Sequence, residues 1–68
     1  MTYWLYKFRC KNATTPKHFA KIHLGKNNNF LVLDREASYY EVEHHDLEYI
    51  GHNMTAEVVT EKIARLDY

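Results

Sequence analysis

The chain of 68 residues has little of what usually holds so small a protein together. It contains one cysteine, Cys10, so an internal disulfide is excluded. A lone thiol in a chain without a signal peptide predicts a reducing, intracellular setting. A core of this size rarely supplies more than about 3–5 kcal/mol of stability by itself. Self-association is the remaining way to stabilise it, and we therefore expect a single domain, residues 1–68, that forms a homodimer.

Long apolar segments are missing too, and so are acidic residues before Asp34. The longest wholly apolar run, Phe30–Leu33, is far shorter than the roughly 20 residues needed to cross a bilayer, so no membrane partner is expected. Residues 1–33 contain six basic residues and no acid. Residues 36–51 reverse this, with five carboxylates, three tyrosines, two histidines and no lysine or arginine. The zero net charge therefore conceals a division of charge along the chain, which is typical of proteins with a charged partner.

Most of the first half has the composition of β-strands. Residues 3–10 are rich in aromatic side chains, which fit a pleated surface. Alternation gives this strand an expected core face, made of Trp4, Tyr6, Phe8 and Cys10. Residues 18–24 alternate as well, and residues 30–33 are apolar on both faces, like a central strand. Gly25–Asn29 between them predicts a hairpin, because Gly and Asn tolerate positive φ; a helix over 17–24 is the alternative.

The acidic stretch, residues 36–51, fits two structures. Its tyrosines and valine favour a strand over 38–43, with Tyr40 and Val42 facing the core. A turn or short helix would then follow, from about His45 to Ile50. Helical spacing is also present, since one stripe would hold Ala37, Tyr40, His44, Leu47 and Gly51.

The last segment has the pattern of an amphipathic helix. Its apolar residues recur at helical spacing and form one narrow stripe: Ala56, Val59, Ile63 and Leu66. Thr55 or Asn53 can cap its N-terminus, and Glu61 precedes Arg65 by four residues, the spacing of a helical ion pair. A strand through 57–64 is the alternative, because this segment contains β-branched residues. Strands followed by a terminal helix predict an α+β fold: a small antiparallel sheet of three to four strands with the C-terminal helix packed on one face.

No motif for catalysis or cofactor binding is present. Cys10 with a histidine, or Glu41 with Glu43, forms a pair on paper, but a chain this short has little room for a concave pocket. Several residues are of types that can bind a metal ion: His18, His23, His44, His45, Asp46 and His52. Structural zinc sites, however, usually combine closely spaced ligands with several cysteines. We therefore expect no enzymatic activity, no cofactor and no metal.

The basic N-terminal strand is a candidate nucleic-acid-binding element. Lys7 and Arg9 beside Tyr3 combine phosphate contacts with a ring for base stacking, a mixture that single-strand binders use. The other interpretation is that this basic strand pairs with the acidic stretch, so that the two neutralise each other across a sheet.

The acidic stretch is a candidate surface for docking on a basic protein. Carboxylates can imitate the phosphates of DNA, and tyrosines add contact area at low entropic cost. The residues expected to bind the partner are Tyr39, Glu41, Glu43, Asp46, Glu48 and Tyr49.

A family resemblance supports this interpretation. It is carried by Tyr39-Tyr40-Glu41, by Asp46-Leu47-Glu48 with Ile50 and Asn53, and by Glu57-Val58-Val59 with Ile63. On these residues, segment 39–68 resembles the uracil-DNA glycosylase inhibitor of phi29-like Bacillus phages. The resemblance implies a small homodimer of sheet and helix, whose helix near Asp46–Ile50 occupies the DNA cleft of the enzyme while the dimer interface traps an apolar side chain. It also implies a phage protein that acts in the host cytoplasm as a non-enzymatic inhibitor and DNA mimic.

Overall fold

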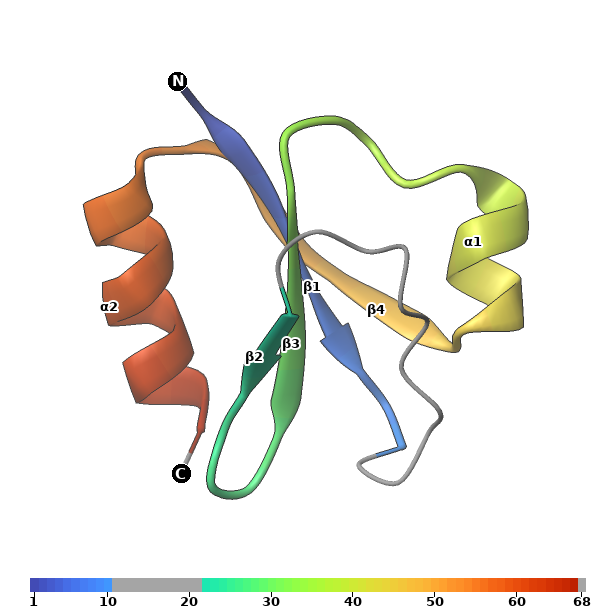
Figure 1. Cartoon of the computed structure of the whole chain (residues 1–68), viewed down its shortest axis with the longest axis horizontal. Helices are drawn as coiled ribbons and strands as arrows, with labels where there is room; N and C mark the ends of the chain where they lie inside the picture. Colours follow the sequence, from blue (N-terminus) through green and yellow to red (C-terminus); the bar gives the residue numbers. More distant parts are fainter. Residues whose placement is uncertain (11–21, 68) are drawn as a thin grey trace.

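The computed structural model describes residues 1–10 and 22–67. Four strands form one antiparallel sheet in the order β2-β3-β1-β4: β1 (Tyr3–Phe8), β2 (Ile22–Leu24), β3 (Asn29–Leu33) and β4 (Leu47–Met54). Two helices accompany it, α1 (Tyr39–His44) and α2 (Ala56–Leu66), on opposite sides of the sheet (Figure 1). The expected α+β fold, with a small antiparallel sheet and a C-terminal helix on one face, is therefore confirmed.

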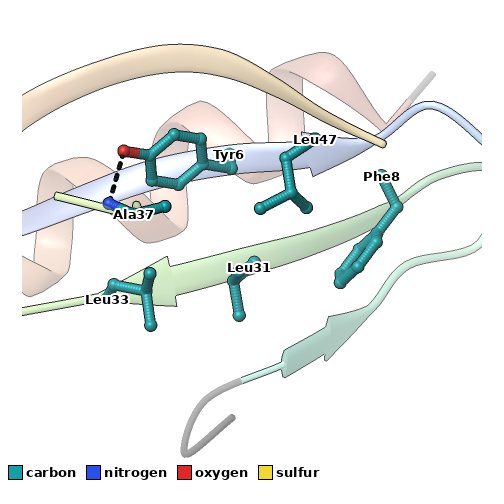
Figure 2. Packing of buried hydrophobic residues seen from close by; sticks show 6 residues of the cluster. All are labelled: Tyr6, Phe8, Leu31, Leu33, Ala37 and Leu47. Carbon is teal, nitrogen blue, oxygen red and sulfur yellow. Dashed lines mark hydrogen bonds between the residues drawn. The ribbon is translucent and has the colours of Figure 1, made fainter. Parts of the chain in front are cut away.

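Both faces of the sheet are covered, and each carries its own core cluster. The side on which α1 lies, here called the α1 face, holds Tyr6, Phe8, Leu31, Leu33, Ala37 and Leu47 (Figure 2). The opposite side, the α2 face, holds Leu5, Phe30, Val32 and Val59. Side chains alternate between faces along a strand, so Leu5 lies on the α2 face although its neighbour Tyr6 lies on the α1 face. A sheet packed on both sides explains why all of β3 is buried.

The predictions for the first half are largely confirmed. Tyr6 and Phe8 share a buried face, as the alternation predicted, and β2 and β3 form the hairpin around residues 25–28. Cys10 was wrongly placed in the core: it is exposed, because β1 ends at Phe8. The part of the expected strand that covers residues 18–21, and with it most of the alternative helix over 17–24, lies outside the described residues.

The strand and the helix expected within residues 36–51 occur in the reverse order. Residues 39–44 form α1 instead of a strand, and residues 47–54 form β4 instead of a turn or helix. Ser38 starts α1 because its hydroxyl accepts a hydrogen bond from the Glu41 N–H at 3.1 Å, while the Glu41 carboxylate accepts one from the Ser38 N–H at 2.9 Å. Asp46 then adopts φ = 52°, a left-handed conformation that Asp tolerates, and this turns the chain into β4.

The C-terminal helix follows its prediction closely. Thr55 is the N-cap, and its hydroxyl accepts from the Val58 N–H at 3.4 Å. Val59 is buried and Ile63 packs against the α2-face cluster, while Leu66 at the end of the stripe is 40% exposed. Arg65 donates to Glu61 at 2.7 Å, the ion pair that the spacing predicted.

The residue after α2 fastens the helix to the β2–β3 hairpin. The Asp67 carboxylate accepts hydrogen bonds from the backbone N–H groups of residues 26, 27 and 28, at 2.7, 2.8 and 2.8 Å. Gly25 permits this approach, since a Cβ there would collide with the Asn28 carbonyl oxygen and lie 2.6 Å from Asp67 Oδ1. Within the described part of the chain, neither helix is long and apolar enough to span a membrane.

Candidate functional site

The position of α1 is set by a hydrogen bond to the sheet. The Ala37 N–H donates to the Tyr6 hydroxyl oxygen at 3.0 Å inside the α1-face cluster (Figure 2). Burial raises the pKa of the Tyr6 phenol, although the hydrogen bond from Ala37 acts in the opposite direction. Because Ala37 immediately precedes the N-cap Ser38, this contact fixes the point where α1 begins. Val42 adds a partly buried contact between α1 and the same cluster.

A second anchor of α1 is an ion pair with the loop that precedes it. Arg35 donates from both terminal nitrogens to the two carboxylate oxygens of Glu41, at 2.9 and 3.1 Å. The Glu41 side chain is only 15% exposed. The hydrogen bond from Arg35, helped by that from the Ser38 N–H, lowers the pKa of Glu41 to about 2. The Glu41 carboxylate therefore already has a cationic partner within the chain.

The outer face of α1 carries two parallel rows of side chains. In one row the Tyr39 hydroxyl donates to Glu43 Oε1 at 2.6 Å. In the other, the rings of Tyr40 and His44 stack with centroids 5.2 Å apart and planes 10° apart. Tyr39 and Tyr40 are 78% and 70% exposed. The prediction that Tyr40 faces the core is therefore wrong. A hollow of about 360 Å³ is lined by these four residues.

The six residues expected to bind a partner do not share one surface. Tyr39, Glu41 and Glu43 lie on α1, and Asp46 lies in the turn that follows. Glu48 and Tyr49 are neighbours on β4, so their side chains point to opposite faces of the sheet. Tyr49 belongs to the α1 face, where its ring contacts Tyr6 at 5.9 Å. Only Tyr39 and Glu43 of the six lie in the hollow of α1.

The basic strand pairs with the acidic one, as the second interpretation of its charges predicted. Arg9 lies 3.5 Å from Asp46 and 3.9 Å from Glu48, and Lys7 stands opposite Glu48 in the sheet. Tyr3 packs against the α2-face cluster. Arg9 and Lys7 thus lie beside acidic residues of β4 or the turn before it, and Tyr3 packs on the α2 face. These three residues do not form a separate basic surface.

An aromatic cluster at the edge of the sheet was not anticipated. Trp4 stacks on His52 with centroids 4.4 Å apart and contacts the Tyr49 ring at 5.8 Å. The Tyr49 hydroxyl also forms a short hydrogen bond with His52 Nδ1. These contacts require β4 to be a strand beside β1. Because a turn or helix was expected at residues 45–50, the sequence did not predict that Tyr49 and His52 would lie beside Trp4. The left-handed Asn53, with φ = 60°, follows the cluster near the end of β4.

The histidines and carboxylates do not gather into a metal site or a catalytic pair in the described part of the chain. Within residues 1–10 and 22–67, no group of three or more His, Cys, Asp or Glu side chains is arranged to hold a metal ion; His18 lies outside these residues. Glu41 is bound to Arg35 while Glu43 is bound to Tyr39, so these two carboxylates do not act as a pair. The helix that the resemblance implies at Asp46–Ile50 is replaced by the start of β4, and the nearest helix is α1. No family model, curated protein or solved structure matches this chain.

Proposed function

We propose that this chain is a non-enzymatic interaction protein that docks the outer face of α1 on a basic surface of another protein. The observation that carries the proposal is the exposure of Tyr39 and Tyr40, 78% and 70%, beside the carboxylate of Glu43. In the described part of the chain, neither tyrosine belongs to a core cluster, and their contacts are with neighbours on the same helix, Glu43 and His44. Tyrosine is enriched at the energetic centres of protein interfaces, where its ring is buried on binding.

The charges around α1 favour a basic partner. Among the described residues, the Glu43 carboxylate has no cationic partner, whereas Glu41, Asp46 and Glu48 each lie near an arginine of the chain itself. An acidic aromatic surface attracts positively charged surfaces and speeds their encounter. In the leading form of the proposal, the partner is the DNA-binding surface of a host enzyme and α1 takes the place of DNA.

Uracil-DNA glycosylase is the named candidate, from the resemblance of residues 39–68. The chain would then be a phage-type inhibitor that acts in the cytoplasm of the host cell. Residues 47–50 begin β4 and Asp46 lies in the turn before it, so α1 takes the role of the cleft-binding helix. A homodimer is also part of the proposal, because a core of this size gains stability from self-association. Sedimentation over about a hundredfold range of concentration tests it, since a dimer dissociates on dilution.

The docking proposal is tested by uracil excision from single-stranded DNA with purified uracil-DNA glycosylase. We expect the chain to inhibit excision, and Tyr39→Ala or Tyr40→Ala to weaken inhibition about tenfold or more, as truncation of an interface anchor does. Val58→Ala is the matched control, because Val58 is 45% exposed on α2. Absence of inhibition by the folded wild-type chain would remove the glycosylase as its target. Equal inhibition by the wild type and both tyrosine variants would remove α1 as the docking surface.

Binding of nucleic acid by Tyr3, Lys7 and Arg9 is the weaker alternative. The ion pairs of Arg9 with Asp46 and Glu48 place two carboxylates where phosphates would have to approach. If the strand does bind nucleic acid, single-stranded DNA or RNA should shift in a gel at low salt, and the affinity should fall steeply as salt rises. Lys7→Glu combined with Arg9→Glu should abolish the shift.

A further inference from the structure

The hollow on α1 has the chemistry of a receptor for one cationic side chain. Among the described residues, it is lined by the aromatic side chains of Tyr39, Tyr40 and His44 and by one carboxylate, that of Glu43. Aromatic faces attract cations, and a carboxylate adds a charge-assisted hydrogen bond to the same cation. We propose that this hollow binds an arginine side chain of the partner protein, an inference that rests on the docking function proposed above.

The two rows of α1 preorganise the hollow. The hydrogen bond from Tyr39 holds Glu43 Oε1 in place, and nothing else in the described part of the chain donates to that carboxylate. This bond also raises the pKa of the Tyr39 phenol, so its oxygen stays protonated and continues to donate. The stacked rings of Tyr40 and His44 form the second wall, with planes only 10° apart. A flat group that enters the hollow meets aromatic side chains and a fixed acceptor.

Other occupants fit this chemistry less well. An apolar side chain would remove water from the Glu43 carboxylate without replacing its hydrogen bonds, which is costly. A phosphate would be repelled by the same charge. A lysine ammonium is a compact, strongly hydrated point charge, whereas a guanidinium is flat, more weakly hydrated and able to stack while its N–H groups donate sideways.

Two residues before Glu43, the chain already contains an arginine–carboxylate contact of the proposed kind. Glu41 already receives two parallel hydrogen bonds from the guanidinium of Arg35, at 2.9 and 3.1 Å. Both carboxylates belong to the same helix, but Glu41 is 15% exposed and saturated, while Glu43 faces the hollow. The partner would therefore supply to Glu43 what Arg35 supplies to Glu41.

The inference is tested by NMR titration of the full, isotope-labelled chain with three capped peptides, Gly-Gly-X-Gly-Gly, where X is arginine, lysine or citrulline. Citrulline keeps the shape of arginine but carries no charge. We expect the arginine peptide to shift the resonances of the four lining residues with a dissociation constant in roughly the millimolar range, since so few contacts are made. Lysine should bind about threefold to fivefold more weakly, and citrulline should not saturate.

Variants then locate the contact. Glu43→Gln should weaken binding of the arginine peptide about tenfold, because it removes the charged acceptor. Tyr40→Ala should weaken it about threefold by removing one ring. Glu57→Gln is the matched control, an exposed acid on α2, and should leave the affinity unchanged. The circular dichroism spectrum of each variant checks that the fold is kept.

Several outcomes would overturn the inference. They are equal affinity for the arginine and citrulline peptides, unchanged affinity in folded Glu43→Gln, and resonance shifts centred away from α1. Any of these defeats the arginine site even where the glycosylase is inhibited through α1, in which case the docking function stands without it. Arginine binding without inhibition of the glycosylase supports the site and rejects that enzyme as the partner.

Discussion

The two helices of this protein contrast in how each is held. α2 has eleven residues, buries Val59 in the α2-face cluster and is fastened at its end by Asp67 to the β2–β3 hairpin. α1 has six residues, none of them buried, and depends on contacts of residues that precede it or lie at its first turn. These contacts are the Tyr6–Ala37 hydrogen bond, the Ser38 cap and the Arg35–Glu41 ion pair.

The contrast suggests different roles for the two helices: α2 contributes to the stability of the fold, and α1 exposes side chains on the surface. Helices as short as α1 are not stable by themselves in water, so tertiary contacts must hold them. Here those contacts come from one side and from the N-terminal end, which leaves Tyr39, Tyr40 and Glu43 directed outward. α2 packs Val59 and Ile63 against the core, whereas α1 exposes its aromatic side chains.

The largest expected loss of stability comes from a substitution that disrupts the packing of α2 on the sheet. Val59→Asp places a carboxylate without a partner where the side chain is 3% exposed, and we expect it to unfold the domain or cost about 3 kcal/mol or more. Val58→Asp, at the adjacent and 45% exposed position, should change stability by less than about 0.5 kcal/mol. Urea denaturation measures both variants. Similar stability of the two would show that α2 does not pack through Val59.

The next effect loosens α1 from the sheet. Tyr6→Phe leaves the buried N–H of Ala37 without an acceptor, and we expect a loss of about 2 kcal/mol. Hydrogen exchange of the α1 amides should also become faster. Tyr39→Phe is the matched control, because it removes a hydroxyl from an exposed ring. If Tyr6→Phe were as stable as this control, the hydroxyl of Tyr6 would not hold α1.

A smaller effect tests the fastening of α2. Asp67→Ala removes the acceptor of three backbone N–H groups, and we expect a loss of about 1.5 kcal/mol, moderated because water reaches part of this site. Glu61→Ala, which removes an exposed ion pair with Arg65, should cost less than about 0.5 kcal/mol. Thermal unfolding distinguishes them. Equal midpoints would mean that the hairpin contact adds nothing to stability.

The smallest effect concerns the acid sensitivity of α1. The pKa of Glu41 is lowered to about 2 from an ordinary value near 4.5, so its ion pair stabilises the folded state above about pH 4.5. This contribution, on the order of 1 kcal/mol, should be lost as the pH falls from about 5 to 2. Glu41→Gln should be less stable than wild type at pH 7 and show a smaller loss of stability down to pH 3. Arg35→Gln should behave alike, and an unchanged acid dependence in both variants would contradict the assignment.

The sequence predicted those parts of the fold whose signals are local and repeated. The apolar spacing and the Thr55 cap identified α2, and Gly25 with its neighbouring asparagines identified the hairpin. α1 and β4 were exchanged because tyrosine and valine composition outweighed a local signal that was present. That signal is the capping box, Ser38 followed three residues later by Glu41.

Contacts between distant residues decided the rest. β4 is a strand because it completes the sheet beside β1, with Leu47 opposite Phe8 and Tyr49 opposite Tyr6. The Asp67 fastening joins residues about forty positions apart, and no sequence pattern links them. In the candidate site, the sequence predicted that Tyr39 points outward. It did not predict the ion pair between Glu41 and Arg35. Only the fold distinguishes Glu41, which is paired with an arginine of the chain, from Glu43, which accepts a hydrogen bond from a tyrosine.

Hydrogen–deuterium exchange of the chain with and without uracil-DNA glycosylase compares the two helices most directly. Binding through α1 predicts slower exchange in residues 39–46 of the complex, where amides become shielded or less able to open. Residues 56–66 should exchange at the same rate with and without the enzyme. The Tyr40→Ala variant should show much less protection at the same concentrations, because fewer molecules are bound. Protection centred on α2, or no difference between the free chain and the mixture at saturating enzyme, would contradict docking through α1.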